Sequence, residues 1–223
     1  MMLLSSVLFS LMSALIRAVP EVNAYTMVMM RFVVGTVGVV FLFALGVDRM
    51  RWTNWTWIVA RGVSGGLACV LSYWSIQHLG LAKALMLSYS YVAFAALFAV
   101  PILGERLLSR HWMAIGLAMA GVALLCGVQN LSVTLADTAA LACGVTSGFA
   151  IVALTKSRET DSAANVFWSQ SLFGIVVAAW PTYTNWVMPT APQWGVLLAI
   201  GILAMGGQLA MTYAYKYTGA AYG

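Results

Sequence analysis

Residues 24–43, AYTMVMMRFVVGTVGVVFLF, and residues 163–182, AANVFWSQSLFGIVVAAWPT, are two apolar stretches that lie 139 positions apart. Each has about the 20 residues that an α-helix needs to cross a bilayer. Under this shift Ala24 falls on Ala163 and Gly35 on Gly174 without a gap. Apolar chains often match by accident, so the coincident hydrophobic segments carry more weight than the identities. Further matched pairs are Ala14 and Ala153, Leu15 and Leu154, Trp55 and Trp194, Gly62 and Gly201, Gly80 and Gly219, and Ala82 and Ala221.

The shift predicts two units, residues 1–128 with five membrane helices and residues 135–223 with about three. Because the number of spans in a unit is odd, the second unit should lie upside down in the bilayer, as in the inverted repeats of secondary transporters. Loop charge agrees, since the charged residues 48–51, DRMR, fall on the uncharged residues 187–190, VMPT. Counterparts of the last two helices of the first unit would begin where the chain stops, at Gly223. We therefore expect about eight of ten helices.

The composition is typical of an all-α polytopic membrane protein, with 62% apolar residues, 8% charged residues and a mean hydropathy of +0.91. A water-exposed globule of this composition would be insoluble. None of the long apolar stretches alternates polar and apolar residues as a barrel strand does, so helices are expected. The predicted spans are residues 2–18, 24–46, 57–77, 83–103, 110–128, 135–155, 163–182 and 193–215.

The basic residues are distributed as expected for a cytoplasmic N-terminus. Seven of the eleven Lys and Arg fall in the connections that would then face the cytoplasm, whereas residues 129–134 and 181–193 contain none. The positive-inside rule therefore predicts a multi-pass protein of the cytoplasmic membrane. Topology also explains the net charge of +5, so nucleic acid is not an expected partner. The seven are Arg49, Arg51, Arg106, Arg110, Lys156, Arg158 and Lys216.

Several motifs together resemble the EamA-type branch of the drug/metabolite transporter superfamily. They are residues 80–84, GLAKA, residues 103–107, LGERL, the glycines Gly116 and Gly121, and the pairs Arg31 and Phe32, and Arg61 and Gly62. The resemblance covers essentially the whole chain. It implies ten helices in two inverted five-helix units, cytoplasmic termini, and export or uptake of small metabolites across the cytoplasmic membrane.

The family often places a proline in the middle of the fourth helix, near Tyr91 or Val92. This chain instead has Pro101 near the end of that predicted helix. A kink at the helix centre is therefore not predicted.

Two arginines lie inside predicted helices, where a charge costs a few kcal/mol unless it is paired or hydrated. Arg31 lies seven residues into its helix from the outer side. It either faces a cavity as an anion-binding or gating residue, or it snorkels outward or clamps carbonyl groups of a neighbouring helix. Arg61 lies nearer the inner interface, which favours a snorkelled, orienting charge.

Other candidate substrate-binding residues are polar side chains that share a helix face. Ser6, Ser10, Ser13 and Arg17 recur every three or four residues, which indicates either a water-filled pathway or close helix packing. Aromatic candidates either stack on a flat substrate or belong to an interfacial belt. The candidates are Tyr73 and Gln77, the adjacent Trp74, the counterparts Gln208, Thr212 and Tyr213, and Ser88 and Tyr91 in the polar run of residues 88–91.

Glu105 and Arg106 form either a cytoplasmic gate through an ion pair or a plain surface pair. The six acidic residues all fall in connections or at helix ends, so no carboxylate is expected in mid-membrane to carry protons. Zinc-binding, nucleophile-elbow and phosphate-loop motifs are absent from the sequence, so we expect neither an enzyme nor a metal or cofactor. The acidic residues are Glu21, Asp48, Glu105, Asp137, Glu159 and Asp161.

The sequence therefore predicts a secondary transporter that carries a small-molecule substrate across the lipid bilayer by alternating access. Among transporters, a carrier of a flat, nucleoside-derivative or vitamin-like substrate is one hypothesis. The alternative from another class is a membrane-embedded structural or accessory protein. Such a protein should pair its polar faces helix to helix without a cavity, whereas a carrier should leave a hydrated space at mid-depth. The sequence is compatible with a homodimer.

Overall fold

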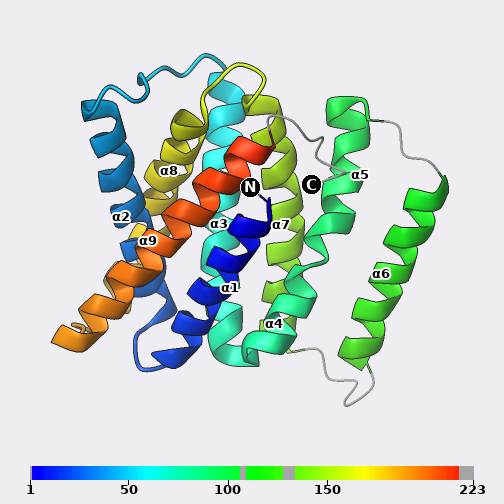
Figure 1. The fold of residues 1–223 in the computed structure, drawn as a ribbon. Coiled ribbons are helices and arrows are strands. Elements are labelled where there is room, and N and C mark those ends of the chain that lie inside the picture. The colour runs from blue at the N-terminus through cyan, green and yellow to red at the C-terminus, as the bar shows by residue number, and fades with distance from the viewer. Residues whose placement is uncertain (1, 106–108, 128–133, 216–223) are drawn as a thin grey trace.

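The computed structural model describes residues 2–105, 109–127 and 134–215, which form nine helices (Figure 1). The connections between α2 and α3 and between α7 and α8 lie at the top of Figure 1, which we call the upper end. The connections between α1 and α2 and between α8 and α9 lie at the opposite, lower end. The helices are α1 (Met2–Ala18), α2 (Ala24–Ala44), α3 (Trp55–Leu79), α4 (Leu81–Ser88), α5 (Tyr91–Leu103), α6 (Ser109–Gly127), α7 (Leu135–Ser157), α8 (Ala163–Thr184) and α9 (Ala191–Ala214).

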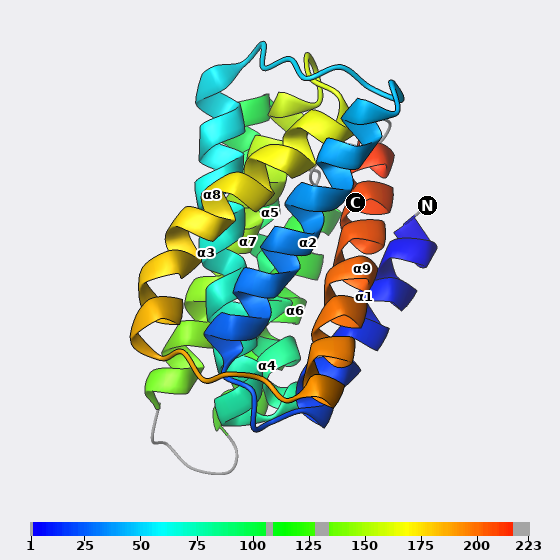
Figure 2. The same cartoon turned by 90° about the vertical axis from the view of Figure 1, so that its left-hand side faces the viewer.

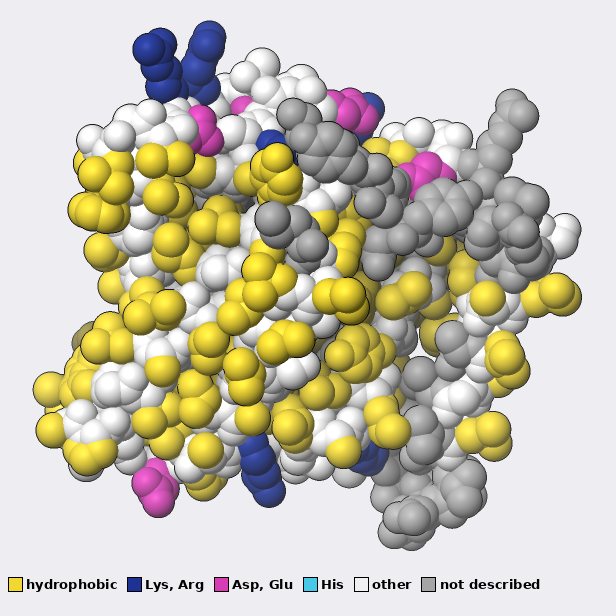
Figure 3. Space-filling model, in the orientation of Figure 1, with side chains coloured by type: hydrophobic (Ala, Val, Ile, Leu, Met, Phe, Trp, Pro, Cys, Tyr) yellow, Lys and Arg dark blue, Asp and Glu magenta, His cyan; other side chains and the backbone are white. Residues whose placement is uncertain are grey.

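The outer surface of the bundle suits a bilayer. Figure 3 shows hydrophobic side chains over the middle of the visible face, with charged side chains towards its upper and lower edges. Such an arrangement places apolar side chains against lipid and charges at the interfaces. In the part of the chain that the structure describes, five helical segments are long and apolar enough to span a membrane, and α1, with 17 residues, is a shorter apolar helix. The five are Ala24–Ala44, Leu81–Leu103, Leu135–Ser157, Ala163–Thr184 and Ala191–Ala214.

Polar residues cap the helices that begin after short connections. The side chain of Asn23 accepts a hydrogen bond from the backbone N–H of Tyr25 at the start of α2. Thr134 and Asp137 form a capping box at the start of α7. These contacts satisfy N–H groups that the first helical turn leaves without partners. Both α2 and α7 begin at the residues that the hydrophobic pattern predicts, 24 and 135.

The predicted helix of residues 83–103 is broken at its centre into α4 and α5, although no proline lies there. Between α4 and α5 the chain makes a tight turn, in which Ser90 N donates to Leu87 O at 3.2 Å and Ala93 N donates to Ser90 O at 3.0 Å. A Cβ atom on Gly144 of α7 would collide with the hydroxyl group of Ser90. The break thus forms without a proline, at a position where the facing helix has no side chain.

The main helix contacts of one predicted unit have equivalents in the other. The 139-residue shift carries α1, α2 and α3 onto α7, α8 and α9. Helix α1 packs on α9 as α7 packs on α3, and α2 packs on α9 as α8 packs on α3. Helices α2 and α8 pack on each other, and Figure 2 shows them side by side. The centre of the bundle is therefore built from helices of both units.

Matched glycines make equivalent close contacts between these helices. A Cβ atom on Gly35 would lie 2.9 Å from Ser171 Oγ, and one on Gly174 would lie 2.5 Å from Phe32. The shift converts one contact into the other, because Gly35 falls on Gly174 and Phe32 on Ser171. Larger residues would hold the helices apart, so glycine permits the close approach. A second equivalent pair of contacts is Gly62 with Phe173 and Gly201 with Val34.

Two large groups of buried apolar residues occupy opposite ends of the bundle. The lower cluster joins the lower halves of α1, α2, α3 and α9, and the upper cluster joins the upper parts of α3, α5, α7 and α8. Members of the lower cluster include Ile16, Met27, Phe32, Ile76 and Leu197. Members of the upper cluster include Ile58, Ala99, Leu154 and Val166.

Candidate substrate cavity

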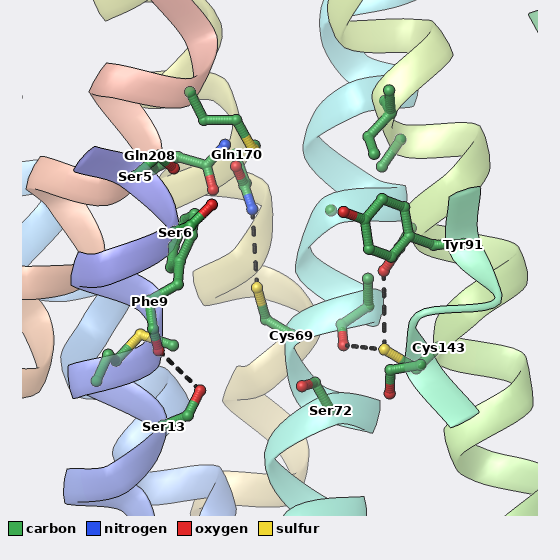
Figure 4. Close-up of a pocket in the computed structure, with 18 of the residues that line it drawn as sticks. Ser5, Ser6, Phe9, Ser13, Cys69, Ser72, Tyr91, Cys143, Gln170 and Gln208 are labelled. Carbon is green, nitrogen blue, oxygen red and sulfur yellow. Dashed lines mark hydrogen bonds between the residues drawn. The ribbon is translucent and has the colours of Figure 1, made fainter. Parts of the chain in front are cut away.

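An open cavity of about 330 Å³ lies between the helices and is lined by residues of both predicted units. Its walls include Met12 and Tyr73 of the lower cluster and Ile151 and Tyr215 of the upper cluster, so it lies between the two. Figure 4 places Phe9 of α1 on one side of this space and Tyr91 on the other. The volume is within the usual range for small-molecule sites.

Five of the predicted substrate-binding residues line this cavity. Three of the four polar residues predicted to share a face of α1 line it too, although the hydroxyl of Ser13 also donates to Phe9 O within α1. The polar stripe of α1 therefore faces the cavity. The five are Arg31, Tyr73, Ser88, Tyr91 and Gln208, and the three are Ser6, Ser10 and Ser13.

Two other candidates on α3 have structural contacts away from the cavity. Gln77 fastens the connection between α1 and α2, since its Nε2 donates to Val22 O at 2.6 Å and its Oε1 accepts from Ala24 N at 2.9 Å. The indole of Trp74 stacks on the ring of His78 with 4.0 Å between ring centroids. Neither Gln77 nor Trp74 lines the cavity.

The remaining predicted residues are also outside the cavity lining. Thr212 is fully buried in α9, and Tyr213 is 48% exposed. Glu105 lies beyond the end of α5 and does not line the cavity. Arg106, its predicted partner in a gate, lies outside the described residues.

Arg31 is buried, at 6% exposed, and lines the cavity. Its Nη1 donates to the hydroxyl of Tyr73 at 3.4 Å and lies 3.9 Å from Met12 Sδ. The guanidinium carbon lies 5.9 Å from the centre of the Phe9 ring and 5.8 Å from that of Tyr73. Aromatic faces at this distance attract a cation. Arg31 therefore lies at the cavity and not at the membrane surface.

Arg61 is also buried, at 3% exposed, so the expectation that it snorkels to the interface is wrong. Its Nη2 donates to Gln170 Oε1 at 2.7 Å, and Gln170 Nε2 donates to Cys69 Sγ at 3.7 Å. Gly65 makes room for this arrangement, because a Cβ atom there would lie 2.9 Å from Arg61 Nη1. A long side chain near a helix end can extend inward as well as outward, which the sequence position alone does not distinguish.

The two arginines give the cavity a positive character. Among the described residues that line it, no side chain is acidic. The Nε atoms of Arg31 and Arg61 are buried without a hydrogen-bond partner. Buried cations without a counter-charge are costly. An anion in the cavity would offset that cost.

Gln170 is the cavity residue for which the sequence held an unused signal. The 139-residue shift places it on Arg31, which was already a candidate. Cys143 also lines the cavity and donates from Sγ to Ala68 O at 3.3 Å. Tyr215 and Ser147 also line the cavity and carry no comparable pattern in the sequence.

Comparisons with known proteins agree with this architecture. The chain is 26% identical over 220 residues to the pseudopaline exporter CntI of Pseudomonas aeruginosa strain UCBPP-PA14, and equally to that of strain PAO1. Each match covers 97% of this chain and 78% of the exporter. A solved crystal structure has a TM-score of 0.71 and 21% identity over 96% of this chain and 80% of that one, which shows a shared fold. A family model of the EamA-like transporter family matches residues 1–127. Because this match covers more than half of the sequence, the chain belongs to the EamA-like transporter family and is an integral membrane transporter.

Proposed function

We propose that this protein is a secondary transporter that moves a small anionic metabolite across the cytoplasmic membrane by alternating access. The observation that carries the proposal is the pair of buried arginines in a cavity whose described lining has no acidic side chain. A buried guanidinium group with free donors is suited to carboxylate or phosphate groups. The substrate would therefore complete the hydrogen bonding of Arg31 and Arg61.

Alternating access in this protein would use two inverted units. The exchange symmetry of the helix packing and the equivalent glycine contacts support an inverted repeat. A cavity lined by both units can open to one side when the units rock against each other. The described part of the two units provides α1, α2, α3, α7, α8 and α9 for this movement.

We place the upper end in the cytoplasm. The connections at that end include Arg49 and Arg51, between α2 and α3, and Lys156 and Arg158, beside the connection between α7 and α8. The lower connection between α8 and α9 has no basic residue. The positive-inside rule favours this orientation. Because the relative from Pseudomonas aeruginosa is named as an exporter, we propose export as the direction.

The rival hypothesis of a purely structural membrane protein is less well supported. Such a protein should pair its polar faces across helix contacts, yet Ser6, Ser10 and Ser88 line an open cavity between the helices. The two arginines also have no carboxylate beside them in the described cavity lining. A flat aromatic substrate has some support from Tyr73 and Tyr91, but two of the predicted aromatic residues lie outside the cavity.

Counterflow into liposomes tests the proposal directly. The protein is reconstituted and supplied with a panel of labelled anionic, neutral and cationic metabolites. We expect anions alone to be exchanged, and Arg31→Gln to lower their rate by about tenfold or more, since a hydrogen bond to a charged group contributes about 1.5–3 kcal/mol. Arg17→Gln, which changes an exposed arginine at the end of α1, should leave the rate unchanged. Exchange of cations alone, or of no compound in the panel, would refute the proposal.

A further inference from the structure

We infer that the substrate carries two anionic groups, one received by Arg31 with Tyr73 and the other by Arg61 with Gln170. The inference rests on the proposed function and specifies the class of its substrate. It starts from the different positions of the two arginines along the cavity. Each has its own neutral partner, at 3.4 Å for Arg31 and 2.7 Å for Arg61.

Residues on one face of α3 contact both arginines. Arg61, Gly65, Cys69 and Tyr73 follow one another at intervals of four residues, so they lie along one side of the helix, and all four line the cavity. The guanidinium group of Arg61 lies level with Gly65, and that of Arg31 contacts Tyr73. Gly65 and Tyr73 are eight residues apart, which corresponds to a rise of about 12 Å along the backbone of α3. Each guanidinium group thus has its own polar partner, and the cavity holds two positive charges, of which a single carboxylate can neutralise one.

The space between the arginines is lined by small, neutral side chains. Gly65 has no side chain, and Cys69 and Ser72 contribute short ones. Across the cavity α1 contributes Ser6 and Ser13. This middle part can hold an uncharged, moderately polar segment that joins two anionic ends.

The two arginines are not matched to each other or to other basic residues by the 139-residue shift. The shift places Arg31 on Gln170 and Arg61 on Ile200, so both cations belong to the first unit. Gln170, at the position equivalent to Arg31, instead holds Arg61 through a hydrogen bond. Two cations in one neutral cavity repel each other and are costly to bury. A substrate with two anionic groups removes this cost at both positions, whereas a monoanion leaves one of them.

The test measures binding without transport. Purified protein in detergent is titrated with unbranched dicarboxylates of four to twelve carbons and with monocarboxylates of the same lengths, and the shift of the unfolding temperature gives each affinity. We expect the best dicarboxylate to bind about tenfold or more tightly than the monocarboxylate of equal length, with an optimum at intermediate length. Equal affinities, or no dependence on length, would overturn the inference.

Substitutions assign the two ends. Arg31→Gln and Arg61→Gln should each reduce the affinity of the best dicarboxylate to that of the monocarboxylate, whereas Arg17→Gln should not. An equal loss for both ligand classes in Arg31→Gln and Arg61→Gln would count against two separate positions. If a variant does not fold, the length series of the unmodified protein still decides. Exchange of monoanions in liposomes without a preference for dicarboxylates would keep the proposed function and overturn this inference. Tight dicarboxylate binding without exchange would keep two anionic positions in the cavity and overturn the proposed function.

Discussion

The connection between α2 and α3 at the upper end and the connection between α8 and α9 at the lower end are equivalent under the 139-residue shift, yet they are held differently. Two side chains of the second predicted unit form hydrogen bonds with the backbone of the upper connection. Asp161 accepts from Thr53 N at 2.7 Å and from Asn54 N at 3.2 Å. Asn165 accepts from Arg51 N at 3.0 Å and donates to Arg49 O at 2.8 Å. Both side chains are buried.

The lower connection has a much weaker link to the other unit. Gln193 donates to Glu21 at 3.1 Å, and this contact is exposed, with Gln193 itself half-buried. Val187 and Met188 of this connection are 60% and 70% exposed. The positions equivalent to Asp161 and Asn165 are occupied by Val22 and Thr26. Neither has the carboxylate or amide group that forms two hydrogen bonds with the upper connection. Two connections at matched positions can thus be held with different firmness, because individual polar residues such as Asp161 and Asn165 make the contacts.

The largest effect in this comparison is expected for Asp161→Ala. The substitution leaves two backbone N–H groups of the upper connection without their acceptor, so the free energy of unfolding should fall by about 2–4 kcal/mol. Hydrogen exchange at the amides of Thr53 and Asn54 should accelerate together with this loss. Unchanged exchange at these amides would show that other contacts hold the connection.

Asn165→Ala should have an intermediate effect. It removes one acceptor for Arg51 N and one donor to Arg49 O, and neither bond involves a charged partner, so about 1–2 kcal/mol should be lost. Chemical denaturation in detergent measures this value. A loss larger than that of Asp161→Ala would reverse the order and would identify Asn165 as the stronger anchor.

Glu21→Ala should have the smallest effect. It breaks the exposed contact with Gln193 but leaves the capping box of α9, in which Gln193 accepts from Thr190 N at 2.8 Å. We expect a change below about 0.5 kcal/mol and no faster exchange in residues 187–193. A destabilisation comparable to that of Asp161→Ala would abolish the difference between the two ends.

Much of the fold could be predicted from the sequence because membrane helices are set by hydropathy and length. Predicted spans coincide with helices, and the spacing of Ser6, Ser10 and Ser13 identifies the polar face of α1. The break between α4 and α5 could not be predicted, because it depends on Gly144 in a distant helix. Periodicity does not show whether a polar residue near a helix end faces a cavity or binds a connection, as Gln77 does.

The site was predictable only in part for the same reason. The depth of Arg31 identifies it as exceptional, and the structure places it at the cavity. The direction of the Arg61 side chain depends on Gly65 and Gln170, which belong to different helices. The sequence gives no sign of such contacts between helices. The 139-residue shift, which matches Gln170 to Arg31, is the one pattern in the sequence that draws attention to Gln170.

The reciprocal glycine contacts also restrict which substitutions the crossing of α2 and α8 can accept. Gly35 accommodates Ser171, and its counterpart Gly174 accommodates Phe32, at the same crossing of α2 and α8. A larger residue at either glycine must be compensated in the opposite half and not in its own. At this crossing a substitution in one predicted unit is therefore coupled to the residue that faces it in the other, whereas the cavity residues and the connections of the two units differ.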